Sequence, residues 1–270
     1  RADLAMYQAK KQGKDRYEIF VPAMQAEFQA HLEMEADLRR AIVRHEFQLH
    51  YQPIVHLRTS EISGLEALVR WEHPERGTIP PLDFIPLAEE TGMIVPIGEW
   101  VLHEACRQVA QWNERRAGRP LTVSVNLSAV QLDQGNLPDL VRSALAGSGL
   151  PARCLVIELT ESLVVDHRPG TLRQLEEVKA LGVRLAIDDF GTGYSSLAYL
   201  RRFPVDIIKI DKSFVDEVGD EPTAAALTLG IIQLGQALHL STIAEGIEDV
   251  GQLTELADGN CELGQGYYFA

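Results

Sequence analysis

Short apolar runs alternate with longer stretches of helical period along most of the chain. The β-rich runs lie at 48–55, 62–69, 121–127, 154–159, 183–188, 205–210, 240–244 and 266–269. Helical patterns lie between them at 82–92, 97–116, 136–147, 168–181, 195–202, 222–238 and 249–257. Strands that alternate with helices form βαβ units, so this order predicts a parallel sheet. Several runs are almost continuously apolar, which indicates strands buried on both faces.

Eight predicted strands with seven helices between them indicate a TIM-like (β/α)8 barrel of the α/β class. An open, doubly wound parallel sheet is the structural alternative. Two further segments precede the barrel. Residues 1–20 predict a helix and a short strand, and residues 23–45 predict one long amphipathic helix that connects or packs.

Charge and cysteine content narrow the class of protein. The chain has 270 residues, with 25 Lys and Arg against 39 Asp and Glu, for a net charge of −14. This balance disfavours DNA binding, which needs clustered basic side chains. With no secretory signal and no apolar run of about 18 residues, we expect a cytoplasmic chain without direct membrane contact. Cys106, Cys154 and Cys261 form no C-x-x-C pair, which favours reduced, buried thiols.

Polar residues stand near, at or shortly after the end of most predicted strands. They are Glu66, Asn126, Glu158, Glu161, Asp188, Asp189, Lys209, Glu245 and Gln265. In a barrel the strand ends meet at one rim, where active sites are built. For any single acidic residue the alternative is a turn or a helix N-cap. The whole set, with paired aspartates and a lone lysine, favours a site.

The chemistry of this set indicates a site for hard metal ions. The candidate ligands supply only oxygen atoms; they are Glu66, Asn126, Glu158, Asp188 and Asp189. Such ligands suit Mg²⁺, Mn²⁺ or Ca²⁺. Two ions about 3.5–4 Å apart would clamp the attacking and leaving oxygens of a phosphodiester. Lys209 would hold the attacking water or balance charge; alternatively it pairs with Asp206 or Asp211.

An ordered series of motifs connects the chain with a known family. The segments are Tyr51-Gln52-Pro53-Ile54, Glu66-Ala67-Leu68-Val69-Arg70-Trp71, Asn126-Leu127-Ser128, Glu158-Leu159-Thr160-Glu161-Ser162, DDFGTGYSSL from Asp188, Ile208-Lys209-Ile210-Asp211, Ala244-Glu245-Gly246-Ile247-Glu248 and Gln265-Gly266-Tyr267. With them the chain resembles the EAL-domain phosphodiesterases that hydrolyse cyclic di-GMP. The resemblance covers about residues 36–270, and its specificity lies in the ordered series rather than in one triplet.

The resemblance implies a barrel with one antiparallel strand and hydrolysis of cyclic di-GMP to linear 5′-pGpG in bacterial second-messenger signalling. The alternative is a catalytically silent cyclic di-GMP receptor. Receptors of this kind usually lack one or more metal ligands or the loop motif, and this chain keeps them all.

The resemblance also implies a role for each matched residue. The implied metal ligands are Glu66, Asn126, Glu158, Asp188, Asp189 and Glu245. They would hold two divalent cations, Mg²⁺ or Mn²⁺, with Ca²⁺ expected to inhibit. The implied catalytic residues are Glu66, Asp188, Lys209 and Glu245, where Lys209 positions the nucleophile and Glu245 is either a ligand or the general base. The implied substrate contacts are Gln52, Arg70 and Gln265, and Glu161 would brace the loop after Asp189.

Alternatives exist for the implied substrate contacts: Arg70 could form a surface ion pair, and the glutamines could bond to the backbone.

The first residues of the chain give a further resemblance. The first 20 residues resemble the last helix and strand of a GGDEF domain through Ala2-Asp3-Leu4-Ala5-Met6-Tyr7, Ala9-Lys10, Gly13 and Phe20, without its cyclase motif. Residues 1–22 would then be the C-terminal remnant of such a domain. We therefore expect a linker helix at 23–35 and an EAL domain at 36–270 whose C-terminal end is truncated. The implied partners are upstream GGDEF or sensor domains and a second copy of the chain.

Overall fold

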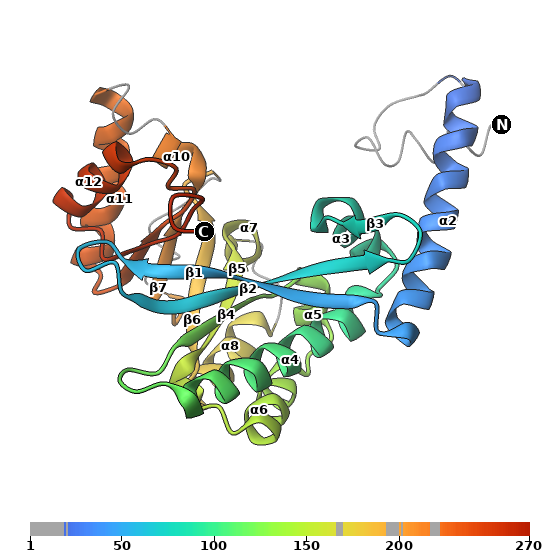
Figure 1. The fold of residues 1–270 in the computed structure, drawn as a ribbon, viewed down its shortest axis with the longest axis horizontal. Helices are drawn as coiled ribbons and strands as arrows, with labels where there is room; N and C mark the ends of the chain where they lie inside the picture. The colour runs from blue at the N-terminus through green and yellow to red at the C-terminus, as the bar shows by residue number, and fades with distance from the viewer. Residues whose placement is uncertain (1–18, 20, 166–169, 193–199, 201, 217–221) are drawn as a thin grey trace. The chain divides into compact units, whose positions relative to one another are not determined.

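The structure is a computed structural model that describes residues 19, 21–165, 170–192, 200, 202–216 and 222–270 (Figure 1). The GGDEF-like segment up to residue 18 and most of the predicted helix at 195–202 lie outside the described residues. The chain divides into two compact units. One contains Arg1–Gln48 and Arg70–Ile94, and the other contains Leu49–Val69 and Val95–Ala270.

Eight strands close into a barrel in the order β1-β9-β8-β7-β6-β5-β4-β2, and β2 pairs with β1 (Figure 1). The strands are β1 (Phe47–His56), β2 (Ile62–His73), β4 (Thr122–Asn126), β5 (Leu155–Thr160), β6 (Arg184–Phe190), β7 (Ile207–Ile210), β8 (Ser241–Ala244) and β9 (Leu263–Gly264). From β2 through β9 the barrel pairs are parallel, whereas β1 runs antiparallel to β9. This confirms the predicted TIM-like barrel with one antiparallel strand.

The last predicted strand is placed wrongly by sequence reasoning. Residues 266–269 form a turn, and the strand is β9, a few residues earlier. The aromatic run at 266–269 has strand-like composition, but Tyr267 is 82% exposed and the segment bonds to a loop instead. Ile247 donates its N–H to the carbonyl of Gln265, and Tyr268 donates to the carbonyl of Ile247. Local contacts therefore override the β propensity of the run.

The longer helices of the second unit lie outside the barrel (Figure 1). They are α4 (Ile94–Arg115), α6 (Leu137–Ser148), α8 (Thr171–Ala180), α11 (Pro222–Ala237) and α12 (Val250–Asp258). Sequence periodicity did not predict the shorter elements α5 (Ala129–Asp133), η1 (Ala152–Cys154), α7 (Glu161–Val165) and α10 (Lys212–Asp216). Pieces this short complete too few turns to show a helical period.

The first unit is built on α2 (Pro22–Arg44), α3 (Pro81–Glu90) and the short strand β3 (Gly77–Ile79), which pairs with β2. Its core contains Phe47, Trp71 and Phe84, whose ring centroids lie 5.8–6.2 Å apart. The long helix predicted at 23–45 is therefore present as α2. Among the described helices, none combines the length and apolar character needed to cross a bilayer.

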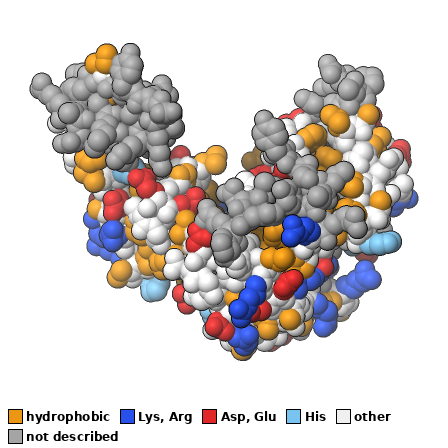
Figure 2. Space-filling view, turned by 180° about the vertical axis from the view of Figure 1, so that it is seen from behind, with side chains coloured by type: hydrophobic (Ala, Val, Ile, Leu, Met, Phe, Trp, Pro, Cys, Tyr) orange, Lys and Arg blue, Asp and Glu red, His pale blue; other side chains and the backbone are white. Residues whose placement is uncertain are grey.

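Charged side chains of both signs are mixed on the surface shown in Figure 2. On that face, the Lys and Arg side chains of the described residues stand among Asp and Glu side chains and hydrophobic ones. The acidic side chains of the described residues are thus spread over this face rather than gathered into one area.

An apolar cluster contributed by six barrel strands lies directly next to the polar strand ends. Its members are Ile54, Val156, Ala186, Ile207, Ile243 and Leu263. Two positions after five of them stand Glu158, Asp188, Lys209, Glu245 and Gln265. Side chains two residues apart on a strand share a face, so the polar residues continue the interior layer toward the carboxyl rim. The strand pattern thus places the polar residues directly next to an apolar layer of the barrel interior.

Candidate active site

Seven barrel strands deliver the candidate residues to one place, six of them at or near their carboxyl ends and β2 through Glu66, which lies before its middle. Glu66 comes from β2, Asn126 from β4, Glu158 from β5, Asp188 and Asp189 from β6, and Lys209 from β7, while Glu245 and Gln265 directly follow β8 and β9. Because these strands are parallel neighbours, their ends form a continuous rim. The side-chain contacts described next join most of this set into one cluster.

Lys209 lies at the centre of the cluster and is only 1% exposed. Its Nζ lies 2.7 Å from Glu158 Oε2, 2.7 Å from Glu245 Oε1 and 3.0 Å from Asp188 Oδ1. The fourth partner is Glu66, whose Oε2 lies 3.3 Å away. A buried ammonium is tolerated only when paired, and here it faces four carboxylates.

The alternative pairing considered for Lys209 is wrong. Asp206 instead accepts from Lys179 Nζ, with its two carboxylate oxygens at 2.6 and 2.7 Å. Asp211 Oδ1 accepts the backbone N–H of Ser213 at the start of α10. Lys209 is therefore committed to the strand-end carboxylates.

Burial and mutual charge shift the pKa values of the cluster. Burial raises the pKa of Glu158 well above its usual range, although Lys209 opposes that shift. Burial alone would lower the pKa of Lys209, but the four carboxylates hold it well above its usual value. At Glu66 burial also acts upward, but Lys209 and the accepted hydrogen bonds lower the pKa overall. Burial raises the pKa of Glu245 to about 7.

Two side-chain amides hold the carboxylates in place. Asn126 Nδ2 donates to Glu66 Oε1 at 2.8 Å. Gln265 Nε2 donates both to Glu66 Oε2 at 2.7 Å and to Glu245 Oε1 at 3.0 Å. Carboxylates accept but do not donate, so these contacts determine which way each amide points. Gln265 thus links two carboxylates from opposite sides of β1, a contact that sequence reasoning did not find.

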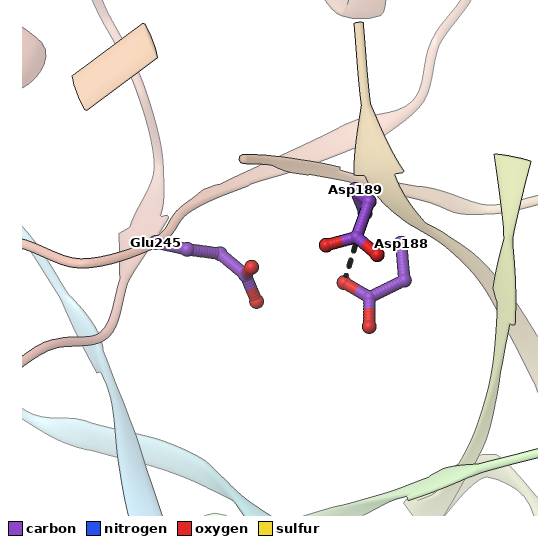
Figure 3. A group of neighbouring side chains, drawn as sticks. All are labelled: Asp188, Asp189 and Glu245. Carbon is purple, nitrogen blue, oxygen red and sulfur yellow. Dashed lines mark hydrogen bonds between the residues drawn. The ribbon is translucent and has the colours of Figure 1, made fainter. Parts of the chain in front are cut away.

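Asp188, Asp189 and Glu245 bring carboxylate oxygens within 4.8 Å of one another (Figure 3). Glu245 and Asp188 reach toward one another from opposite sides of the space in that view. Adjacent strand residues normally point to opposite faces, but Asp189 has a φ of 53°. This left-handed backbone costs about 1–2 kcal/mol and turns the second carboxylate toward the first.

The donor set fits divalent metal ions. All offered ligand atoms are oxygens, which is the set preferred by Mg²⁺ and Mn²⁺. Glu158 Oε1 is buried and has no hydrogen-bond partner. A buried, unsatisfied carboxylate oxygen is costly, and a cation would satisfy it. The cluster therefore has both the ligand chemistry and an open acceptor for a metal.

Glu161 fixes the start of the segment after Asp189. Its buried carboxylate accepts the N–H of Gly191 through Oε2 at 2.9 Å. Gly191 has a φ of 103°, and a Cβ there would lie 2.6 Å from the ring of Phe214. Only glycine fits this position, and its N–H is the group that Glu161 accepts; the bracing role of Glu161 stays a prediction. The Gly193–Leu197 part of the loop motif lies outside the described residues.

The contacts given above do not include two of the predicted substrate contacts, Gln52 and Arg70. Gln52 is half-buried on β1. Arg70 lies on β2 in the first unit, whereas the cluster lies in the second. Their roles stay predictions. Asp211, which sequence reasoning considered only as a partner of Lys209, adds negative charge near Asp189 and contributes to the raised pKa of that carboxyl, after burial and Asp188.

Known proteins similar to this chain carry the same domain. The EAL domain family matches residues 35–270. The bifunctional diguanylate cyclase/cyclic di-GMP phosphodiesterase MucR of Pseudomonas aeruginosa is 45% identical over 266 residues, which cover 98% of this chain and 39% of MucR. The cyclic di-GMP phosphodiesterase PdeR of Escherichia coli is 40% identical over 269 residues, 100% of this chain and 40% of PdeR. The chain thus spans well under half the length of these curated relatives.

Solved structures agree with this assignment. The PaMucR phosphodiesterase in complex with c-di-GMP superposes with a TM-score of 0.84 at 44% identity, covering 88% of this chain and 96% of that one. The FimX EAL domain of Pseudomonas aeruginosa bound to c-di-GMP has a TM-score of 0.78 at 26% identity, covering 87% and 94%. The motifs, the barrel and the strand-end carboxylates agree with the family match over residues 35–270. The chain therefore belongs to the EAL-domain family.

Proposed function

We propose that this chain is a metal-dependent phosphodiesterase that hydrolyses cyclic di-GMP to linear 5′-pGpG in bacterial second-messenger signalling. The observation that carries the proposal is the convergence of four carboxylates on buried Lys209 at the carboxyl rim. Relatives named as cyclic di-GMP phosphodiesterases, at 40–45% identity, support the choice of substrate.

We propose two cation sites at this rim. Glu66, Asn126, Glu158 and Asp188 would hold one ion, and Asp188, Asp189 and Glu245 would hold the other. Mg²⁺ or Mn²⁺ fits these oxygen ligands, and Ca²⁺ would bind with looser geometry and inhibit. When bound, such ions polarise the phosphate and lower the pKa of a water.

The side chains of the chain itself supply charge and proton transfer. Lys209 stays charged because four carboxylates raise its pKa, so it can orient a nucleophilic water and balance negative charge. Glu245, with a pKa of about 7, suits a proton acceptor at neutral pH. Its place beside Asp188 and Asp189 also suits a ligand, and both roles are proposed for it.

The direct test is incubation of the purified chain with cyclic di-GMP and Mg²⁺, Mn²⁺ or EDTA, followed by chromatography. We expect pGpG with either metal and none with EDTA. Binding of cyclic di-GMP without product, in a longer chain as well as in this one, would instead favour the silent receptor. Retention of all the motif residues supports the enzyme.

Metal affinity is expected to fall with pH because ligands must be deprotonated to bind. The carboxyl of Glu245 has a pKa of about 7, so protons compete with the metal below that pH. We expect Mn²⁺ to bind about tenfold more weakly at pH 6 than at pH 8. Calorimetric titration at both values measures this, and the Glu245→Gln variant should show a flatter dependence. Equal affinity at the two pH values in the unmodified chain contradicts the prediction.

Gln265 is expected to act by holding carboxylates rather than by contacting a guanine base. Its Nε2 is already committed to Glu66 and Glu245. Gln265→Leu should therefore lower kcat about 10–100-fold and leave KM for cyclic di-GMP nearly unchanged. Gln52→Leu is the matched comparison, because a lost substrate contact raises KM instead. A raised KM with unchanged kcat in Gln265→Leu would restore the substrate-contact interpretation.

Further proposals concern the surroundings of the domain. We propose that residues 1–22 belong to an upstream GGDEF domain, 23–35 to a linker helix and 36–270 to the EAL domain. The name of MucR, which joins a cyclase to a phosphodiesterase, supports this arrangement. We also propose a homodimer and a cytoplasmic location, the latter supported by three buried free cysteines. Sedimentation showing only monomer at micromolar concentration would contradict the dimer.

A further inference from the structure

The segment that carries Asn126 passes from strand to helix almost without a loop. β4 ends at Asn126, and Ser128 is already the N-cap of α5. Leu127 donates its N–H to the carbonyl of Glu158 at 2.9 Å, which ties the segment to β5. Asn126 itself is exposed, and besides its hydrogen bond to Glu66 the backbone that bears it determines where its side chain lies.

A reciprocal capping arrangement holds this backbone. Ser128 Oγ accepts the N–H of Val130 at 3.2 Å. Gln131 Oε1 in turn accepts the N–H of Ser128 at 3.2 Å. Such a capping box satisfies donors at both ends of the first helical turn. The side chain of Gln131 therefore controls the residue two positions after Asn126.

Gln131 is buried and occupies the space above Gly98 of α4. A Cβ at Gly98 would lie 2.1 Å from Gln131 Nε2, 2.5 Å from Cδ and 2.6 Å from Oε1. Glycine is unfavourable inside a helix, so its presence at this position is explained by the carboxamide that it admits. Gly147, inside α6, has nothing within 4 Å of the same construction.

We propose that Gln131, seated against Gly98, is a positioning residue that sets the place of Asn126 at the metal rim. The path runs from Gln131 to Ser128 by a hydrogen bond, along the backbone to Asn126, and from Asn126 Nδ2 to Glu66 Oε1 at 2.8 Å. The inference rests on the proposed metal-binding role of Asn126. If it is right, the affinity for metal depends on the contact between Gln131 of α5 and Gly98 of α4, two helices outside the barrel.

The experiment compares two substitutions of Gln131 in the full chain. Gln131→Met keeps the volume above Gly98 but loses the acceptor for Ser128, whereas Gln131→Glu keeps both. Affinity for Mn²⁺ alone, without substrate, is measured from the free-ion signal in electron paramagnetic resonance. We expect Gln131→Met to bind Mn²⁺ about tenfold more weakly and Gln131→Glu to recover most of the affinity.

Gly98→Ala tests the same contact from the other side. Its new Cβ must displace Gln131, so Mn²⁺ affinity should fall as in Gln131→Met, and the double variant should lose less than the sum of the two. Gly147→Ala is the matched control, a helical glycine with free space, and should bind Mn²⁺ like the unmodified chain. If Gly98→Ala does not fold, the comparison of Gln131→Met with Gln131→Glu decides whether the proposal holds.

Several outcomes would overturn the proposal. One is Gln131→Met with a lowered Tm but Mn²⁺ affinity within about twofold of the unmodified chain, which indicates a purely structural role. Another is equal weakening by Gln131→Glu and Gln131→Met. Absence of Mn²⁺ binding in the unmodified chain also overturns it. If Mn²⁺ binds but cyclic di-GMP is not cleaved, the proposed function fails while the Gln131 comparison still stands.

Discussion

Replacing Asp188 by asparagine is expected to abolish turnover of cyclic di-GMP, with a fall in kcat of at least about a thousandfold. Asp188 is the carboxylate common to both proposed cation sites, and it lies 3.0 Å from the ammonium of Lys209. The amide keeps the shape but removes the charge that would hold the two ions together. One substitution therefore disturbs both ions and the nucleophile.

The measurement is single-turnover hydrolysis at saturating Mn²⁺, together with the Mn²⁺ affinity of the variant. Asp139→Asn serves as the matched control, because Asp139 is exposed on α6 and pairs with the exposed Arg142. It should leave both quantities unchanged. Near-normal turnover in Asp188→Asn at saturating metal would contradict the assignment of this carboxylate cluster as the active site.

Replacing Lys209 by methionine is expected to have the largest effect on stability as well as to abolish turnover. The substitution leaves Glu66, Glu158, Asp188 and Glu245 without their shared buried cation. Removing one partner from a buried ion pair typically costs about 3–5 kcal/mol. Lys179→Met is the control; its partner Asp206 is partly exposed, and the expected cost is about 1 kcal/mol or less.

The Lys209 variant should also respond to pH in a definite direction. Lys209 lowers the pKa of Glu158 and Glu245 against the upward pull of burial, so its loss lets both pKa values rise. A carboxyl with a raised folded-state pKa contributes stability at low pH that is lost as the pH rises through that value. The metal-free variant should therefore unfold at higher urea concentration at pH 5 than at pH 8. The opposite order would show that the carboxylates do not depend on this cation.

Much of the barrel could be predicted from the chain because strand patterns repeat along it. The sequences Val156-Ile157-Glu158 and Ile207-Ile208-Lys209 each put a polar residue two positions after an apolar one, on the same face. Parallel pairing then brings the polar ends together. The strand pattern is local and the parallel pairing follows from the order of the elements. A rim of carboxylates can therefore be expected without knowledge of any distance between side chains.

What could not be predicted depends on contacts between distant segments. Nothing in the run at 266–269 shows that its backbone bonds to Ile247 and leaves the strand to β9. The left-handed φ of Asp189 has no glycine to signal it. The double donation by Gln265 needs both carboxylates in place. The partners of Lys209 come from four different strands or their ends.

The antiparallel junction between β1 and β9 has a consequence for how the barrel moves. It is a seam of two residue pairs, Val55 with Gly264 and His56 with Leu263, where the first barrel strand meets the last. Short ladders open locally at lower free energy than the rest of a sheet. We expect seam amides to exchange with deuterium before those of β5 and β6. Because Gln265 stands at the seam, bound metal should slow the exchange of the seam amides. The exchange rate would then report whether the site is occupied, even in variants that have lost activity.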